Sequence, residues 1–376
     1  MSVTYTWVGW NRQKKMYDAV VAGGIAAYLI LFVTGGKLLA SPGEGLSSVT
    51  LLIRALGTCG IVLLHIVLCI GPMARLDGRL LPLLYNRRHL GVMTFFVGCS
   101  HAVLSIFWYH AGGDINPLLS LLTANTNYLS IGGFPFETLG LLSLLILFLM
   151  AATSHDFWLK NLSPRIWKSL HMLVYAAYGL LVMHVVLGVL QHERSLVYPV
   201  LLGGGVLVVG GLHIAAGLRE NHSDARGIAV EAGDATGPRW VDVGSVDEIP
   251  DKRAKIVCLR DMSSREPERI AVFRHNGTIS VVSNVCEHQG GPLGEGKIVG
   301  GCITCPWHGY QYAPESGQSP PPFTEKIKTY EVRVEGRRIL VNPVGNPRGT
   351  RVEPARFEEP TSAPSQRDDT SRSMAE

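Results

Sequence analysis

Four side chains with metal-binding chemistry lie in two short segments near residue 300. The first segment reads Cys-x-His, with Cys286 and His288; after sixteen further residues the second reads Cys-x-x-His, with Cys305 and His308. Thiolates and neutral imidazoles are ligands for zinc and for iron–sulfur clusters. A structural Cys2His2 zinc site is one interpretation, but its paired ligands are normally separated by two or more residues, so Cys-x-His is tight for it. The pattern therefore indicates a metal centre and argues against zinc.

The sequence around these ligands resembles the Rieske family over residues 239–344. The resemblance is carried by Cys-Glu-His-Gln-Gly-Gly-Pro-Leu from residue 286 and by Cys-Pro-Trp-His-Gly from residue 305. In a Rieske [2Fe–2S] centre two thiolates hold one iron and two imidazoles hold the other. The resemblance implies that Cys286 and Cys305 bind one iron, and that His288 and His308 bind the second. The surrounding glycines and prolines allow both loops to turn tightly.

Two departures separate this segment from the quinol-oxidising branch of the Rieske family, whose members carry an extra Cys in each cluster loop and a Ser two residues after the second His. Here Cys302 is a lone extra thiol and Tyr310 takes the Ser position. The segment thus resembles the ferredoxin and oxygenase type. Fewer hydroxyl hydrogen bonds to the sulfurs predict a potential toward the low end of the Rieske range of about −150 to +300 mV. The remaining cysteines are interpreted as packing residues: Cys59, Cys69, Cys99 and Cys258.

A second set of candidate ligands lies in the apolar first half of the chain. Its histidines fall within or at the ends of long apolar stretches: His65, His89, His101, His171, His184 and His213. Ionisable residues at membrane depth are costly and usually face a bundle interior, and neutral imidazole is an axial ligand of haem iron. His171 and His184 are thirteen residues apart, about 20 Å along a helix, which predicts ligands at two depths. The alternative, kept for His65 and His213 taken singly, is a hydrogen bond between helices.

Residues 85–190 resemble the ferric-reductase-like transmembrane superfamily. It includes ferric reductases, NADPH oxidases and the haem-binding membrane subunit of a bacterial methionine sulfoxide reductase system. The matching text is Arg-Arg-His-Leu-Gly from residue 87, then His101, and Trp167 to His171 followed by His184.

That resemblance implies b-type haem in a six-helix core. His101 and His184 are the expected outer axial pair. His171 then binds an inner haem and needs a partner, for which His89 and His65 are the two candidates. One or two haems are therefore expected.

The two kinds of predicted site need different surroundings, one in a membrane and one in a soluble domain. The charged residues are distributed along the chain in a way that indicates both. The chain has 376 residues, of which 47% are hydrophobic and 17% charged; ordinary soluble domains have about 25% charged residues. Residues 1–217 hold 20 of the 64 charged residues, and the remaining 159 residues hold 44. This asymmetry indicates a membrane half followed by a soluble half. The net charge of +4 is too small and too dispersed to indicate a nucleic acid partner.

Six apolar stretches have the length of a spanning helix, for which about 20 residues cross the bilayer: 18–36, 48–71, 89–109, 135–153, 169–190 and 196–217. One side of the predicted bundle collects the following basic residues: Arg12, Lys14, Lys15, Arg75, Arg79, Arg87, Arg88, Lys160, Arg165, Lys168, Arg219 and Arg226. The other side has only Lys37 and Arg194. By the positive-inside rule, both termini and the soluble half are expected to be cytoplasmic, with the bundle in a bacterial inner membrane.

The second half shows short β-type runs separated by turn signals such as Asn276-Gly277, which predict a small antiparallel β domain. The predicted fold has two domains: an all-α six-helix transmembrane bundle over residues 1–217 and a small all-β Rieske-type domain over residues 239–344. Residues 218–238 are interpreted as a polar linker, and residues 345–376 as a disordered tail.

These features predict a membrane-bound electron-transfer oxidoreductase. Electrons would pass from a cytoplasmic donor protein to the cluster, then through b-type haem to an acceptor at the outer face, such as ferric iron, a quinone or a periplasmic protein. No strand-bounded G-x-G-x-x-G motif of a nicotinamide module is found, and no mononuclear iron domain follows residue 344. Two alternatives remain: a ferredoxin-like carrier anchored by a membrane domain without haem, and a quinone-linked reductase.

Overall fold

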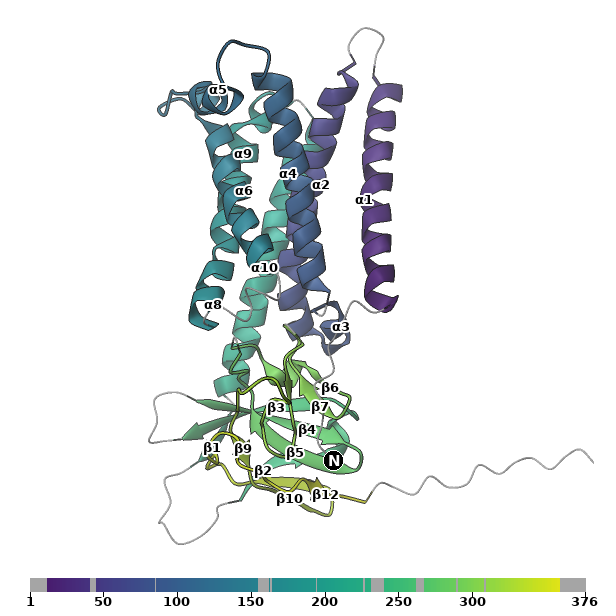
Figure 1. Ribbon diagram of the computed structural model, residues 1–376, viewed down its shortest axis with the longest axis vertical. Helices are drawn as coiled ribbons and strands as arrows, with labels where there is room; N and C mark the ends of the chain where they lie inside the picture. The colour runs from purple at the N-terminus through teal and green to yellow at the C-terminus, as the bar shows by residue number, and fades with distance from the viewer. Residues whose placement is uncertain are drawn as a thin grey trace, which may run out of the picture.

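The computed structural model of the chain describes residues 12–40, 45–84, 86–154, 162, 164–193, 195–225, 227–230, 240–261, 267–288, 290–307 and 309–358. Within these residues six spans are long and apolar enough to cross a membrane. They are α1 (Arg12–Leu38), α2 (Ser48–Leu76), α4 (Arg87–His110), α6 (Phe136–Thr153), the pair α8 (Pro164–Met172) and α9 (Val174–Leu187), and α10 (Val197–Ala225). A β-rich domain follows them (Figure 1), so the predicted fold class is confirmed.

The central helix of the bundle is α2. Of its membrane span, 61% is buried inside the protein, against 17% or less for each of the other five spans. Its first turn is capped by Ser47, whose hydroxyl accepts a hydrogen bond from the Thr50 N–H. Helix α1 stands at the edge of the bundle with none of its span buried (Figure 1). Short elements connect the spans: η1 (Gly78–Leu80), α3 (Leu81–Leu84), α5 (Pro117–Thr123), η2 (Ile131–Gly133) and η3 (Val189–Gln191).

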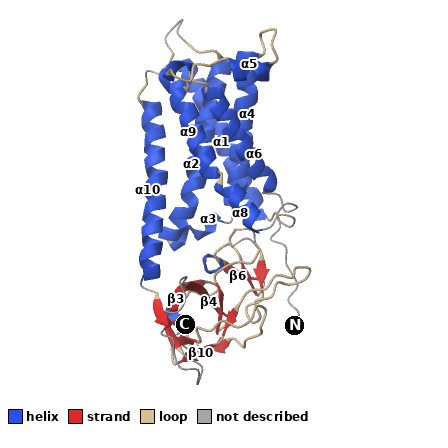
Figure 2. Cartoon of the chain, turned by 90° about the vertical axis from the view of Figure 1, so that its left-hand side faces the viewer, coloured by secondary structure: helices blue, strands red, loops and turns tan. Residues whose placement is uncertain are grey.

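The fifth span is broken at Leu173, between α8 and α9. At this point the Leu173 N–H donates to the Leu170 carbonyl, a tighter turn than in an α-helix. The break lies between His171 and His184, so their relative orientation does not follow that of an ideal helix. Helices α3 and α8 lie at the end of the bundle that faces the soluble domain (Figure 2).

The soluble domain is built from three small sheets. The first sheet has the order β1 (Ile228–Val230), β3 (Ala254–Asp261), β4 (Glu268–His275), β5 (Thr278–Ser283) and β12 (Ala355–Arg356), and β9 (Thr329–Tyr330) also pairs with β5. The second sheet has the order β10 (Val332–Glu335), β11 (Arg338–Val341) and β2 (Val241–Ser245). The third sheet has the order β6 (Lys297–Val299), β7 (Cys302–Thr304) and β8 (Gln311–Tyr312). The predicted turn at Asn276-Gly277 joins β4 to β5, and both residues have positive φ, as a type I′ hairpin requires.

Two sequence-based boundaries were wrong. The sixth helix does not end at residue 217 but continues to Ala225, because its polar last turns pair with the soluble domain through Glu220 and Asp224. The interpreted linker also contains β1, which pairs in parallel with β3. Of the interpreted disordered tail, residues 345–358 are described and ordered: β12 pairs with β5, and the Asn346 N–H donates to the Thr329 carbonyl. Residues 359–376 lie outside the described residues.

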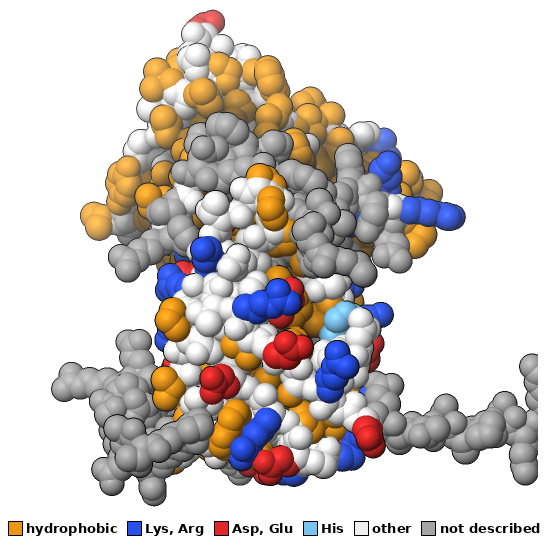
Figure 3. Space-filling model, turned by 60° about the horizontal axis from the view of Figure 1, so that its bottom comes forward, with side chains coloured by type: hydrophobic (Ala, Val, Ile, Leu, Met, Phe, Trp, Pro, Cys, Tyr) orange, Lys and Arg blue, Asp and Glu red, His pale blue; other side chains and the backbone are white. Residues whose placement is uncertain are grey.

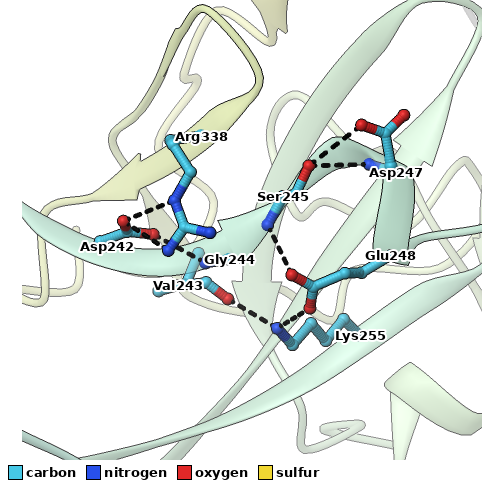
Figure 4. A network of polar contacts seen from close by, with 8 residues as sticks. All are labelled: Asp242, Val243, Gly244, Ser245, Asp247, Glu248, Lys255 and Arg338. Carbon is cyan, nitrogen blue, oxygen red and sulfur yellow. Dashed lines mark hydrogen bonds and ion pairs between the residues drawn. The ribbon is translucent and has the colours of Figure 1, made fainter.

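The end of the soluble domain far from the bundle is held by a polar network around β2 and η4 (Val246–Glu248). Ser245 and Glu248 form a capping box, in which the Glu248 carboxylate also accepts from Lys255 (Figure 4). Arg338 on β11 pairs with Asp242 on β2. Seen from below, acidic and basic side chains are dispersed over the soluble domain, whereas apolar side chains dominate the bundle above it (Figure 3).

Ion pairs join the soluble domain to the end of the bundle that faces it. Arg75 near the end of α2 lies 3.6 Å from Glu220 on α10 and 3.6 Å from Glu295 in η5 (Leu293–Glu295). Arg269 on β4 pairs with Glu220 at 2.9 Å and also with Asp224. This shared network, together with the pairing of β1 and β3, sets the position of the domain below the bundle.

Candidate redox sites

Two loops with the same backbone design carry the predicted cluster ligands. One follows β5 and the other joins β7 to β8. In the first, the Gly290 N–H donates to the Cys286 carbonyl, and the Cys286 N–H donates to the Gly291 carbonyl. In the second, Gly309 and Tyr310 bond to Cys305 in the same two ways. Gly290 and Gly309 both have a φ of 73°, which a residue with a side chain adopts only with strain.

The two loops bring their cysteines into one buried layer. Cys286 and Cys305 are each 1% exposed. Gly291 of the first loop lies so close to the second that a Cβ on it would be 2.7 Å from Cys305 Sγ. The ring of His288 stacks on Tyr310, with centroids 4.4 Å apart. The fourth predicted ligand, His308, lies outside the described residues.

Within the described part of the chain, no group of three or more His, Cys, Asp or Glu side chains is arranged to hold a single metal ion. A mononuclear zinc site needs four such ligands around one ion. A binuclear cluster needs only two protein ligands on each iron, because bridging sulfides complete each coordination sphere. In the described loops, Cys286 and Cys305 lie together in one buried layer, which fits a pair of thiolates on one iron of such a cluster.

Tyr312 on β8 is a cluster-loop contact that the sequence analysis missed. Its hydroxyl lies 3.4 Å from Cys286 Sγ and accepts a hydrogen bond of 3.3 Å from the His288 N–H. Since the oxygen accepts from the backbone, its proton is free to donate to the sulfur. Burial raises the pKa of Tyr312, so the donor stays protonated. The predicted scarcity of hydroxyl hydrogen bonds to the sulfurs rested on the residue at position 310 alone. No local pattern in the sequence links Tyr312 to a cysteine 26 residues earlier.

The Tyr310 hydroxyl does not replace the Ser hydroxyl that the quinol-oxidising branch carries at this position. Its hydroxyl donates to the Glu325 carboxylate, and its ring packs edge-on against Phe323. Burial and the neighbouring Glu325 raise the pKa of Tyr310. Tyr310 thus supports the ring of His288 from one face and is anchored away from the sulfurs.

The predicted outer haem pair comes together near the end of the bundle away from the soluble domain. His101 on α4 and His184 on α9 have ring centroids 6.5 Å apart. Two imidazoles that face one metal through bonds of about 2.0 Å have ring centres roughly 6 Å apart. His101 Nδ1 lies 2.9 Å from the Ile53 carbonyl and His184 Nδ1 lies 2.8 Å from the Phe136 carbonyl.

Because a carbonyl only accepts, each Nδ1 carries the proton, and each Nε2 keeps the lone pair that binds a metal. Glycines make room for the rings: a Cβ on Gly57 would lie 3.0 Å from His101 Cε1, and one on Gly140 would lie 2.8 Å from His184 Nδ1. These residues fit a bis-histidine haem.

The predicted inner ligand, His171, sits on α8 and has the same tautomer. Its Nδ1 lies 3.0 Å from the Trp167 carbonyl, and its Nε2 is buried without a hydrogen-bond partner among the described residues. The Trp167 ring stacks on the His171 ring, with centroids 3.7 Å apart and planes inclined by 24°. A buried imidazole nitrogen with a lone pair and no donor facing it fits an axial ligand.

Of the two candidate partners of His171, His89 is paired with a carboxylate, whereas His65 Nε2 is buried without a hydrogen-bond partner among the described residues. His89 Nδ1 lies 3.0 Å from both carboxylate oxygens of Asp18 on α1. The ring of His65 packs edge-on against Tyr178, and Gly205 on α10 makes room for it, since a Cβ there would lie 2.5 Å from His65 Cε1. His213, interpreted as a hydrogen-bonding histidine, lies 3.1 Å from the Tyr175 hydroxyl.

Comparisons with known proteins agree with this division of the chain. A family model described as Rieske [2Fe-2S] domain matches residues 239–331, and one described as ferric reductase like transmembrane component matches residues 56–182. The protein-methionine-sulfoxide reductase heme-binding subunit MsrQ of Bordetella pertussis is 31% identical over 194 residues, which are 50% of this chain and 86% of that relative.

The naphthalene 1,2-dioxygenase system ferredoxin component of Pseudomonas aeruginosa is 29% identical over 28% of this chain and 95% of its own length. Among solved structures, the ferredoxin of carbazole 1,9a-dioxygenase from Nocardioides aromaticivorans is 23% identical, covering 28% of this chain and 98% of its own, with a TM-score of 0.24.

The two predicted resemblances are confirmed, and with them the two cofactors: a Rieske [2Fe–2S] cluster in the soluble domain and haem in the membrane domain. The chain belongs to the ferric-reductase-like transmembrane family and is an integral, multi-pass membrane protein of electron transfer in which that domain is joined to a Rieske [2Fe–2S] domain.

Proposed function

We propose that the protein carries single electrons from the Rieske cluster to b-type haem and across the membrane to an acceptor on the far side. One observation carries the proposal: the second cluster loop touches the helix that bears His171, through a contact of Trp307 with Trp167 on α8. The cluster and the haem each supply one-electron chemistry when bound. The chain's own side chains would hold and orient both.

The ligand set of the proposal follows the site geometry. Cys286 and Cys305 would bind one iron, and His288 and His308 the other, as the matched backbone of the two loops supports. His101 and His184 would bind the outer haem through their Nε2 atoms. His171 would bind an inner haem, with His89 or His65 as its partner.

The proposed orientation places the soluble domain and both termini in the cytoplasm of a bacterial cell, with the bundle in the inner membrane. The distribution of basic residues supports this orientation: most of them lie on the described ends of α1, α2, α4 and α10 that face the soluble domain. Lys160, Arg194 and Arg226 lie outside the described residues.

The proposed direction runs from a cytoplasmic donor protein to the cluster, to haem, and to an outer-face acceptor such as ferric iron, a quinone or a periplasmic protein. The names of the relatives support this direction, because one belongs to a reductase and the other is a ferredoxin of an oxygenase system. Both kinds of system consume electrons that a carrier must deliver.

The test uses the purified full-length protein. We expect a Rieske EPR signal, a b-type haem spectrum, and haem reduction that follows cluster reduction. His101→Ala and His184→Ala should each remove haem absorbance, His171→Ala should remove part of it, and His213→Ala, on the Tyr175 contact, should leave it unchanged. A protein with the EPR signal and no haem would contradict the proposal and favour a membrane-anchored ferredoxin-like carrier.

A second candidate function, exchange of electrons with a quinone in the bilayer, is favoured by a cavity of about 350 Å³ between α1, α2 and α4. Its lining is apolar apart from the hydroxyls of Tyr17 and Tyr28. Asp18 and His89 are paired with each other, and they follow and precede the lining residues Tyr17 and Leu90 in the sequence. In this function they would exchange protons with the quinone. Haem reduction by a short-chain quinol that is lost in Asp18→Asn would support this function, and its retention would contradict it.

A further inference from the structure

The cluster loop and the membrane bundle meet through two tryptophans. Trp307 stands between the predicted ligands Cys305 and His308. Its ring centroid lies 6.4 Å from that of Trp167, with the planes inclined by 38°, within the usual range for aromatic pairs in contact. Trp167 in turn stacks on His171. Three aromatic rings therefore lead in an unbroken series from the cluster loop to a buried histidine of the bundle.

Both tryptophans are held in place by their surroundings. Trp167 is 8% exposed, and its indole N–H donates to the Thr153 carbonyl at the end of α6 at 3.4 Å. Trp307 packs against the first cluster loop so closely that a Cβ on Gly291 would lie 3.2 Å from its Cδ2 atom. That same Cβ would be 2.7 Å from Cys305 Sγ, so the Trp307 ring and the Cys305 sulfur both border Gly291.

We propose that Trp307 and Trp167 form the electron relay between the Rieske cluster and the haem bound at His171, an inference that rests on the proposed function. Electron tunnelling falls steeply with every gap between atoms, and stacked or touching π systems leave small gaps. One electron crosses: the cluster is oxidised by one electron, the haem iron is reduced by one, and no bond is made or broken. The tryptophans act through the overlap of their rings and return unchanged.

Other contacts hold the domain in place, so the relay can be tested without separating the two halves. Arg269 pairs with Glu220 and Asp224, Arg75 pairs with Glu295, and β1 pairs with β3. None of these involves a tryptophan. Removing one indole ring should therefore leave the distance between cluster and haem unchanged.

The experiment measures haem reduction in the purified full-length protein after the cluster has been photoreduced. Four variants are compared: Trp167→Leu, Trp167→Phe, Trp307→Leu and Trp307→Phe. Matched controls are Trp108→Leu, on the outer part of α4, and Trp240→Leu, whose ring packs under Arg333 in the soluble domain. An independent readout is the relaxation of the cluster EPR signal by ferric haem, which reports their separation without any turnover.

Both leucine variants should slow electron transfer roughly tenfold, equivalent to about 1.4 kcal/mol in an effective barrier. The phenylalanine variants should lose less, because they keep an aromatic ring. The double leucine variant should be slower than either single variant, because the loss of each ring widens the gap that the electron must cross. EPR relaxation, haem content and both controls should match the wild type.

Unchanged rates in the leucine variants, with both centres intact, would overturn the relay. So would a rate loss accompanied by weaker EPR relaxation, because the tryptophans would then serve only to dock the domain. A wild-type protein that contains both centres but passes no electron between them would instead overturn the proposed function, and the relay with it.

Discussion

The rings of His101 and His184 lie across the bundle from each other, with centroids 6.5 Å apart and planes inclined by 81°. Each ring donates its Nδ1 proton to a backbone carbonyl at the same sequence separation of 48 residues. The two carbonyls belong to Ile53 on α2 and Phe136 on α6, so four helices determine one pair of imidazoles. Such bonds orient the rings and raise the basicity of the nitrogen that faces the metal. The bundle thus orients both imidazoles so that their Nε2 atoms are left for the proposed ligation of one haem iron.

Gly140→Ala should disturb this pair. The new Cβ would lie 2.8 Å from His184 Nδ1, so the ring must shift and its bond to the Phe136 carbonyl must weaken. Overpacking of this kind typically costs 1–3 kcal/mol. We expect a lower haem content and an altered haem spectrum in the purified variant.

The matched control for this substitution is Gly23→Ala on α1, where a Cβ would meet nothing within 4 Å. That variant should keep the wild-type spectrum and haem content. Wild-type haem in Gly140→Ala would show that the position of the His184 ring does not matter for haem binding.

Tyr312→Phe should lower the reduction potential of the cluster. Its hydroxyl donates toward Cys286 Sγ, and a hydrogen bond to sulfur stabilises the more negative, reduced cluster. A hydrogen bond contributes about 1 kcal/mol, which for one electron corresponds to about 40 mV. An EPR-monitored redox titration measures the shift.

The control for Tyr312 is Tyr330→Phe, which removes a buried hydroxyl bonded to Glu268 in the other core of the domain. Its cluster potential should equal that of the wild type. An unchanged or higher potential in Tyr312→Phe would mean that the hydroxyl does not stabilise the reduced cluster.

What could be predicted from the sequence depended on how far apart the interacting residues are. The Cys-x-His and Cys-x-x-His pairs are local, so residue types and spacing alone indicated the metal centre. The contact of Tyr312 with Cys286 requires the loop after β5 and the strand β8 to meet, and the contact of Trp307 with Trp167 spans 140 residues and two domains. Neither leaves a periodic or local signal.

The sequence-based boundary errors have a similar cause. Hydropathy ended the sixth helix at residue 217 because the following residues are polar. Those residues remain helical because Glu220 and Asp224 find partners in Arg269 and Arg75 of other elements. The polar residues after 217 thus mark an interface between the two domains, although their polarity alone favours a linker.

Cys302→Ala should leave the cluster intact, whereas Cys286→Ala should abolish it. Burial raises the pKa of the Cys302 thiol to about 11, so it remains a protonated, apolar packing group on β7 at neutral pH. We expect full EPR intensity in Cys302→Ala and a loss of about 1 kcal/mol in the free energy of unfolding. Loss of the EPR signal from a folded Cys302→Ala protein would mean that the ligand set is incomplete.

Glu295→Gln should change how the stability of the domain junction depends on pH. Burial raises the pKa of Glu295 above its ordinary value of 4.5, against the opposing effect of Arg75. A carboxyl whose pKa is raised in the folded protein binds its proton more tightly there than in the unfolded chain. Its contribution is therefore most favourable below pH 4.5 and is lost as the pH rises through the raised pKa.

The thermal midpoints of wild type and Glu295→Gln, compared from pH 4.5 upward, isolate this contribution. The wild type should lose stability relative to the variant as the pH rises, with a slope of at most about 1.4 kcal/mol per pH unit, the limit for one proton. The exposed carboxyls Asp247 and Glu248 do not interfere, because ion pairing lowers their pKa values and their contributions change only below that window. Parallel pH profiles for the two proteins would show that Glu295 keeps its ordinary pKa and that its side chain stays hydrated at the junction.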